Sequence, residues 1–240
     1  MRRIQIIVIG FIFLFSVSTS FSKDDFQEIK AQDVKKIMDS GKQLLLLNPL
    51  SDIEFNQQHI PGSVNIPMQK IETSDKLPKE KDFFIITYCL GRKCTVSVNA
   101  AKKLSSMGYT NIKIFKDGIP GWAKAGYELN TENALKKVKV PKIKIKELKS
   151  ILDEIYLIDI RSKKNRSNLG WIKQSHHIPL SFLSSRLNEI PKNKKIVVMD
   201  HAGKQVLTAS LFLISKGYKD VHRVQGGMMK WVTTGNSVEK

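Results

Sequence analysis

The chain has 240 residues, which allows one large domain or two small ones. Hydrophobic residues make up 41% and aromatic residues 8%, enough for a packed core, so a disordered chain is excluded. Two cysteines exclude a disulfide-rich scaffold and a four-cysteine zinc site. The net charge of +18 comes from scattered lysines with one denser run at 136–149, which indicates a solvated surface. We expect no nucleic-acid partner, although a positive field attracts anionic substrates and anionic membrane surfaces.

The first 22 residues have the order of a secretory signal peptide. Two arginines precede an uncharged, almost wholly apolar run at 4–17, and small residues lead from there to a charged segment. We predict cleavage after Ser20 or Ser22, a periplasmic or secreted protein, and no stable membrane span after cleavage. The apolar run is shorter than the roughly 20 residues of a membrane helix, so an uncleaved anchor is the less favoured alternative. Outside the cytoplasm the two cysteines can oxidise.

The rest of the chain contains one pattern twice. Each half has three short runs that predict strands, and the first two of them indicate buried strands. These runs lie at 44–47, 83–88 and 112–115 in the first half and at 155–158, 194–199 and 221–224 in the second. A helical pattern between the last two runs ends at a glycine in C-cap position, Gly108 or Gly217. Each half closes on a glycine turn and a tryptophan, Trp122 or Trp231, which we expect to pack under the sheet edge.

Strands that alternate with helices predict parallel α/β units, and two repeats of this kind predict two domains. We place the domains at 23–130 and 142–240, with a linker at 131–141 that lacks apolar periodicity. The residue after the second strand is Cys89 in one half and Asp200 in the other, 111 positions apart. The helix-ending glycines are 109 positions apart. We therefore expect two extra residues in the first half, in the loop after the cysteine and the start of its helix.

A cysteine directly after a central strand, in this order of elements, resembles the rhodanese-like sulfurtransferase family. The matching residues lie at 48–50, 54–55, 59–63, 65–67, 88–89 and 118–122 in the first half and at 157–161, 178–179, 203, 217–218 and 226–231 in the second. The resemblance covers nearly the whole chain after the signal as a tandem pair. It implies an α/β fold in which each domain has a central, mostly parallel sheet flanked by helices, and an enzyme that transfers sulfur.

The two halves depart from the family pattern in different places. The family's Asp-x-Arg after the first strand is kept at Asp159-Ile160-Arg161, whereas the first half has Asn48-Pro49-Leu50. The family nucleophile falls on Cys89 in the first domain and on Asp200 in the second. Because an aspartate cannot form a persulfide, we expect an inactive second domain, retained for packing, for shaping a cleft or for binding.

The position of Cys89 suits a catalytic nucleophile. Backbone N–H groups and a helix dipole at the start of a helix lower a thiol pKa, and the thiolate is the nucleophilic form. We predict a thiosulfate or polysulfide sulfurtransferase in which Cys89 takes sulfur from a small anionic donor and passes it to a thiol, including a protein thiol, or to a cyanide-like acceptor. This two-step covalent reaction needs no metal and no cofactor.

We predict that the loop after Cys89 binds the donor through Leu90, Gly91, Arg92, Lys93, Cys94 and Thr95. Gly91 permits a tight turn, and Arg92 and Lys93 add positive charge for an anionic donor. Thr95 and Ser97 either cap the next helix or donate to the persulfide. Cys94 is either a resolving thiol that forms a disulfide with Cys89 or, the alternative that we favour, a small buried residue at the helix start.

Two other functions stay open. The longer loop is compatible with a thiol-redox activity or with an oxyanion activity of phosphatase or arsenate type, but an oxyanion enzyme needs an arginine fork where this loop ends in Cys94-Thr95. A binding module without turnover is the third possibility. The five histidines show no metal-ligand spacing; we expect a structural role for His59, and His201 beside Asp200 is a candidate for a binding role. Met228-Met229 fits a core or an interface better than a copper site.

Overall fold

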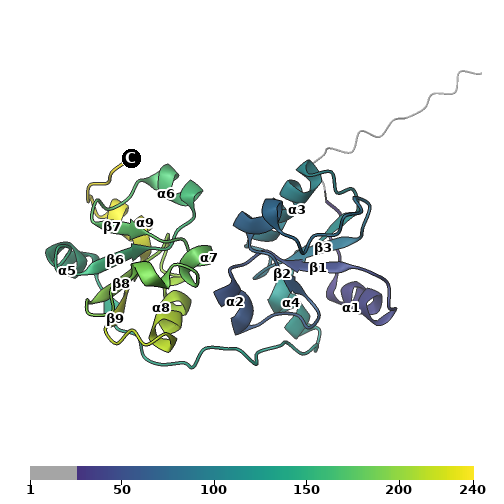
Figure 1. Cartoon of the computed structure of the whole chain (residues 1–240), viewed down its shortest axis with the longest axis horizontal. Coiled ribbons are helices and arrows are strands. Elements are labelled where there is room, and N and C mark those ends of the chain that lie inside the picture. Colours follow the sequence, from purple (N-terminus) through teal and green to yellow (C-terminus); the bar gives the residue numbers. More distant parts are fainter. Residues whose placement is uncertain (1–25) are drawn as a thin grey trace, which may run out of the picture.

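The computed structural model describes residues 26–240, so the predicted signal peptide lies outside the described residues. Two α/β domains lie beside each other and are joined by an extended segment (Figure 1). Each domain has one sheet whose strands all pair in parallel, with helices against both faces. The predicted fold class is confirmed.

The first domain has a four-stranded sheet in the order β2-β1-β3-β4. Its strands are β1 (Leu45–Asn48), β2 (Val64–Asn65), β3 (Ile85–Tyr88) and β4 (Ile112–Phe115). Its helices are α1 (Ala31–Asp39), α2 (Asp52–Gln57), the 3-10 helix η1 (Met68–Thr73), α3 (Val96–Ser106) and α4 (Gly118–Lys124). Neighbouring residues of β1 point to opposite faces: Leu46 packs in the cluster with α1 and α4, and Leu45 and Leu47 pack in the cluster with α3. Both faces are therefore buried, as an unbroken apolar run predicts.

The second domain repeats this arrangement with one more edge strand, in the order β5-β9-β8-β6-β7. Its strands are β5 (Lys142–Ile143), β6 (Tyr156–Asp159), β7 (Ser175–His177), β8 (Ile196–Met199) and β9 (Val221–Val224). Its helices are α5 (Ile145–Ser150), α6 (Lys163–Leu169), α7 (Leu180–Leu183), the 3-10 helix η2 (Leu187–Glu189), α8 (Val206–Ser215) and α9 (Gly227–Thr233). In the first domain the place of β5 is taken by a single bridge between Glu28 and Ile114.

The segments after β4 and β9 differ from the prediction. The expected glycine turns are the first turns of helices α4 and α9. Trp122 and Trp231 are buried as expected, and their indole N–H groups donate to the carbonyl oxygens of Glu128 and Ser237 at 2.8 and 2.9 Å. The two adjacent methionines lie in different environments: Met228 is in the core and Met229 is 41% exposed.

The two domains meet where α2 faces α7 and α8 (Figure 1). Ile53 of α2 is buried in the apolar cluster of the second domain. Ser184 Oγ donates to Asp52 Oδ2 at 2.6 Å, and Gln205 Nε2 donates to Glu54 Oε1 at 2.8 Å. The first domain thus contributes one side chain to the core of the second.

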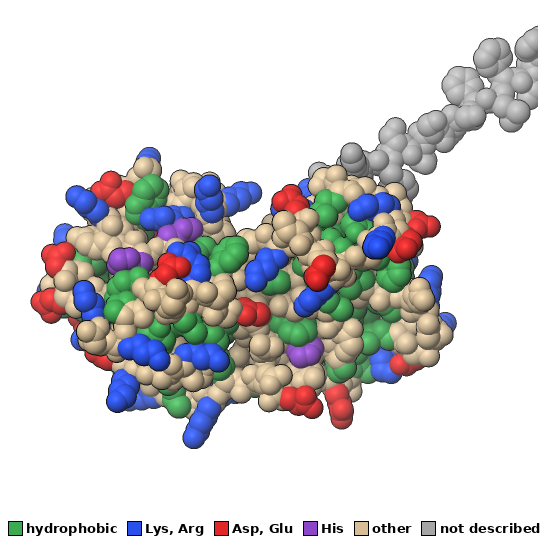
Figure 2. Space-filling view, in the orientation of Figure 1, with side chains coloured by type: hydrophobic (Ala, Val, Ile, Leu, Met, Phe, Trp, Pro, Cys, Tyr) green, Lys and Arg blue, Asp and Glu red, His purple; other side chains and the backbone are tan. Residues whose placement is uncertain are grey.

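The described helices are too short or too polar for a bilayer: none in residues 26–240 combines the length and apolar character of a transmembrane helix. Figure 2 shows Lys and Arg side chains spread over the visible face of both domains and interspersed with acidic ones.

Candidate active site

Cys89 lies at the carboxyl end of β3, the strand that pairs with both β1 and β4. It is 1% exposed. Six residues, 90–95, separate it from α3, and its carbonyl oxygen accepts the N–H of Ile119 in α4 at 3.0 Å. The first N–H groups of a helix have no partner within that helix, so α3 presents donors and the positive end of its dipole near the cysteine.

Two glycines hold this loop against α4. Gly91 has φ +113°, a conformation that side-chain-bearing residues rarely adopt, so the expected tight turn is present. Gly118 has φ +55°, and a Cβ there would collide with the carbonyl oxygen of Cys89 and lie 2.8 Å from the nitrogen of Gly91. The close approach of α4 to the loop therefore requires glycine at position 118.

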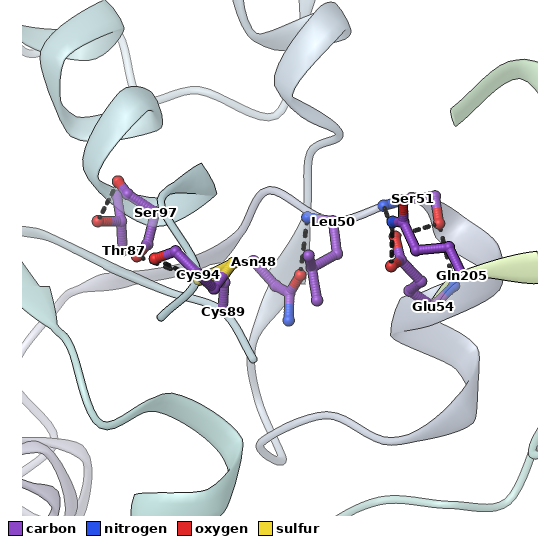
Figure 3. Close-up of a disulfide and its surroundings, with 9 residues drawn as sticks. All are labelled: Asn48, Leu50, Ser51, Glu54, Thr87, Cys89, Cys94, Ser97 and Gln205. Carbon is purple, nitrogen blue, oxygen red and sulfur yellow. Dashed lines mark hydrogen bonds between the residues drawn. A yellow bond between two sulfur atoms is a disulfide. The ribbon is translucent and has the colours of Figure 1, made fainter. Parts of the chain in front are cut away.

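Cys89 and Cys94 form a disulfide with a Cα–Cα separation of 6.5 Å (Figure 3). The separation is within the range usual for disulfides. Our preferred interpretation of Cys94 as a small buried residue is wrong, because Cys94 is half-buried and bonded to Cys89. The less favoured interpretation, a disulfide between two cysteines five positions apart in one loop, is the one that agrees with the structure.

Ser97 points at the sulfur of Cys89. Its Oγ lies 3.3 Å from Cys89 Sγ, and because a disulfide sulfur carries no proton, the hydroxyl is the donor (Figure 3). Thr87 Oγ1 donates to the carbonyl oxygen of Ser97 at 3.1 Å, and Ser97 is 1% exposed. Thr95 is at the N-cap of α3 but makes no side-chain capping hydrogen bond, so the expected cap is absent. A role for Thr95 in donor binding stays a prediction.

The charges of the loop are distributed unevenly. Arg92 is 54% exposed and donates to Asp117 Oδ1 at 2.8 Å and to Glu28 Oε2 at 3.0 Å. The hydrogen bond from Arg92 holds the pKa of the Asp117 carboxyl below its ordinary value. Within residues 26–240, Lys93 has no carboxylate within 4.0 Å. Much of the charge of Arg92 is therefore compensated, whereas that of Lys93 is available to an anion.

A hollow of about 620 Å³ lies over this loop. Lys30 and Lys124 line it together with Leu90, Gly91, Arg92 and Lys93. Leu90 is 44% exposed. Lys30 and Lys124 carry no local signal in the sequence, because they lie 59 and 35 positions from Cys89 and only the packing of α1 and α4 brings them to the loop.

The turn that contains His59 has a structural role, as expected. The His59 ring stacks on Phe55 with centroids 3.8 Å apart, and its Nδ1 lies 3.0 Å from the Phe55 carbonyl oxygen. The hydroxyl of Tyr88 lies 2.7 Å from Ser63 Oγ and accepts the N–H of Ile60 at 3.1 Å. Burial raises the Tyr88 pKa, so this phenol stays neutral beside the cysteine.

In the second domain the corresponding position is Asp200, which is 2% exposed. Its carboxylate accepts the backbone N–H of Gly203, and Gln205 N donates to its Oδ2 at 2.6 Å. Five residues, 201–205, precede α8, compared with six before α3, and α3 has 11 residues compared with 10 in α8. The two extra residues of the first domain are therefore divided: one lies in the loop and the other belongs to the helix.

The family model for the rhodanese-like domain matches the chain twice, at residues 30–125 and 144–234. The chain belongs to the rhodanese-like domain family. A sulfurtransferase from Allochromatium vinosum is 28% identical over 83 residues, which cover 35% of this chain and 77% of that protein. The putative sulfur carrier protein YrkF of Bacillus subtilis is 23% identical over 169 residues, which cover 69% of this chain and 89% of that protein.

Among solved structures, a thiosulfate sulfurtransferase from Pseudomonas aeruginosa aligns with a TM-score of 0.42 and 20% identity over 89% of this chain and 43% of that one. The match of the family model establishes membership, and sulfurtransferases are among the relatives of the chain.

The two rhodanese-like domains also differ after their first central strand. Asp159 accepts the backbone N–H of Arg161 at 3.1 Å and pairs with its guanidinium at 2.8 and 2.6 Å, all buried. Asn48 accepts the N–H of Leu50 at 3.0 Å in the same turn, with no ion pair. The first domain thus keeps the turn with neutral side chains, which avoids the desolvation of two charges.

Proposed function

We propose that the protein is an exported sulfurtransferase that moves sulfane sulfur from an anionic donor, thiosulfate or polysulfide, to a thiol or cyanide-like acceptor through a persulfide on Cys89. The observation that carries the proposal is the placement of Cys89: a buried sulfur between the end of β3 and the start of α3, with the Ser97 hydroxyl 3.3 Å away. Membership in a family that includes sulfurtransferases supports it.

The chemistry begins from the reduced loop. The Cys89 thiolate attacks the outer sulfur of thiosulfate, the bond between Cys89 Sγ and that sulfur forms, and the S–S bond of the donor breaks to release sulfite. The persulfide anion on Cys89 has the hydroxyl of Ser97 and the donors of the helix start for stabilisation. An acceptor thiolate or cyanide then attacks the outer sulfur and frees the Cys89 thiolate.

The charge around the loop favours an anionic donor. Lys30, Lys124, Arg92 and Lys93 line the hollow, and Asp117 is the one carboxylate in its lining. Such a site raises the local concentration of thiosulfate or polysulfide and loses this advantage at high salt. An oxyanion hydrolase is less well supported, since the loop's arginine is directed to Glu28 and Asp117.

The export part of the proposal rests on the first 22 residues, whose basic start, apolar run and small residues have the order of a signal peptide. The Cys89–Cys94 disulfide is compatible with an oxidising compartment. Fractionation of cells that make the full chain tests this part: recovery from the periplasm or medium in a form that begins after residue 20 or 22 is expected, and full-length protein in the cytosol would contradict it.

Mass spectrometry of the Cys94→Ser variant tests the chemistry. After reduction and exposure to thiosulfate, we expect a gain of about 32 Da, one sulfur atom, on the peptide that contains Cys89, and its removal by cyanide. The double variant Cys89→Ser, Cys94→Ser is the control and should gain nothing. An unchanged mass in Cys94→Ser under these conditions would refute the proposed function.

A further inference from the structure

We propose that Cys94 gives the protein a second activity, the reductive release of the transferred sulfur as sulfide. This inference rests on the proposed persulfide at Cys89. Its starting point is the disulfide between the chain's two cysteines, which lie in one loop after β3. The corresponding loop of the second domain, which begins with Asp200, contains no cysteine. Lys204 lies two residues before α8, the position that Cys94 has relative to α3.

The release step balances within the loop. Cys94 loses its proton and attacks Sγ of the Cys89 persulfide, so a bond forms between the two cysteine sulfurs. The bond from Cys89 Sγ to the outer sulfur breaks, and that sulfur leaves with the electron pair and the proton as HS⁻. The outer sulfur is reduced by two electrons, and the two cysteine sulfurs are oxidised to the disulfide that the structure contains.

Proximity favours this internal reaction over an external acceptor. The Cys94 sulfur reaches bonding contact with Cys89 Sγ without leaving the loop, whereas an external acceptor must first diffuse to the outer sulfur. An attack within one loop also avoids the entropy cost of bringing two molecules together. The preferred fate of the sulfur is therefore release as sulfide unless a small acceptor takes the outer sulfur first.

The difference in exposure between the two cysteines determines which sulfur an external reductant attacks when the disulfide is reduced. Cys94 is half-buried and Cys89 is buried, so an external dithiol reaches the Cys94 sulfur first. Its attack breaks the disulfide with Cys89 as the leaving thiolate, which lies beside the Ser97 hydroxyl and the start of α3. The second thiol of the dithiol then frees Cys94, and the oxidised dithiol departs with two electrons fewer. Each sulfide released thus consumes one dithiol.

The test is a single turnover without reductant. Wild-type protein is reduced, freed of reductant under anaerobic conditions and mixed with excess thiosulfate. We expect one equivalent of sulfide and one of sulfite per chain, and a protein about 2 Da lighter than the reduced form. Addition of dithiothreitol should make sulfide release continuous. Cys94→Ser should release sulfite but no sulfide until reductant is added, and should keep the extra sulfur on Cys89.

Lys204→Ser is the matched control, because it places the same residue at the corresponding position of the other loop and leaves both cysteines. It should release sulfide as wild type does. Trypsin helps the assignment, since it cleaves after Arg92 and Lys93 and separates the two cysteines into different peptides unless the disulfide joins them.

The outcomes separate this inference from the proposed function. A wild-type persulfide that persists on Cys89 without sulfide would overturn the inference and leave the proposed function intact. An extra sulfur found on Cys94 would also overturn it, because the sulfur would then be relayed and not released. The proposed function itself would be refuted if wild type released no sulfite and Cys94→Ser took up no sulfur.

Discussion

The loops after β3 and β8 have the same position in their domains and different first residues. Both follow a buried central strand, both precede a long helix, and both are held by a glycine at the start of the next helix, Gly118 or Gly227. In the second domain the Asp200 carboxylate accepts the loop's own N–H groups, whereas in the first a sulfur occupies the corresponding position. The second loop thus holds a carboxylate at the end of its strand, and under the proposed function the first loop holds a negative sulfur there only during the reaction.

The sharpest test of this difference replaces each first residue by serine. Cys89→Ser should reduce thiocyanate formation from thiosulfate and cyanide to background, because a hydroxyl at this position cannot hold a persulfide. Asp200→Ser should leave the rate within about twofold of wild type, because its loop contributes no atom to the reaction. Circular dichroism must show that both variants fold. Loss of activity in a folded Asp200→Ser variant would assign the second loop to the reaction.

The two supporting glycines should respond alike, which tests whether the frames are equivalent. Gly227 has φ +59°, and a Cβ there would lie 2.6 Å from the carbonyl oxygen of Asp200. We expect Gly118→Ala and Gly227→Ala each to lower the free energy of unfolding by about 2–4 kcal/mol, from backbone strain and a steric clash. Urea denaturation measures this.

Gly126→Ala separates strain from clash, because Gly126 has φ +84° and nothing within 4 Å of a Cβ. It should cost only about 1 kcal/mol. Equal losses in all three variants would mean that contact with the loops is unimportant.

Neutralising the permanent anion should have a smaller effect. The Asn side chain of Asp200→Asn has one acceptor oxygen where the carboxylate has two. One of the N–H groups of Gly203 and Gln205 therefore faces the amide N–H₂ or loses its hydrogen bond. We expect a loss of about 1–3 kcal/mol in the free energy of unfolding, from a buried charge-assisted hydrogen bond. Cys89→Ser, measured under reducing conditions, should cost less than this. An unchanged free energy of unfolding in Asp200→Asn would show that the carboxylate does not stabilise its loop.

The smallest effect concerns the pH response of the first loop. Arg92 holds the folded-state pKa of Asp117 below its ordinary value. The ionised carboxylate therefore stabilises the fold at a pH above the ordinary pKa, and this contribution is lost as the pH falls through the folded-state pKa. Arg92→Gln should raise the Asp117 pKa toward its ordinary value, as measured by NMR titration of the carboxyl carbon. An unchanged pKa would show that the ion pair does not persist in solution.

Local sequence signals predicted three strands of each sheet, missed the short edge strands β2, β5 and β7, and predicted the charges around the site poorly. The runs at 112–115 and 221–224 are strands β4 and β9 without any shift, because each is bounded by the glycine that ends a helix and by the glycine of the next turn. Cys89 was identified because a cysteine after a central strand is a local pattern. The pairing of Arg92 with Glu28, 64 positions away, was not predictable, because it depends on how the segment before α1 packs beside the loop.

The serine and cysteine roles illustrate the same limit at shorter range. Thr95 and Ser97 were equivalent candidates in sequence, and the helix geometry decides between them: Thr95 is exposed, and Ser97 is turned inward to the sulfur. For Cys94 the sequence contained both interpretations, and only the fold of the six-residue loop brings the two sulfurs together.

Ile53 of α2 has a consequence for how the chain is made. Its side chain is buried against residues such as Leu183 and Phe212, which are synthesised long after α2 itself. At about 5–20 residues per second, the interval between the end of the first domain near residue 130 and Phe212 is roughly 4–16 s. During that time a finished first domain exposes an isoleucine that has no partner yet. The nascent chain therefore has a defined period in which a chaperone or another copy of the chain can bind that site.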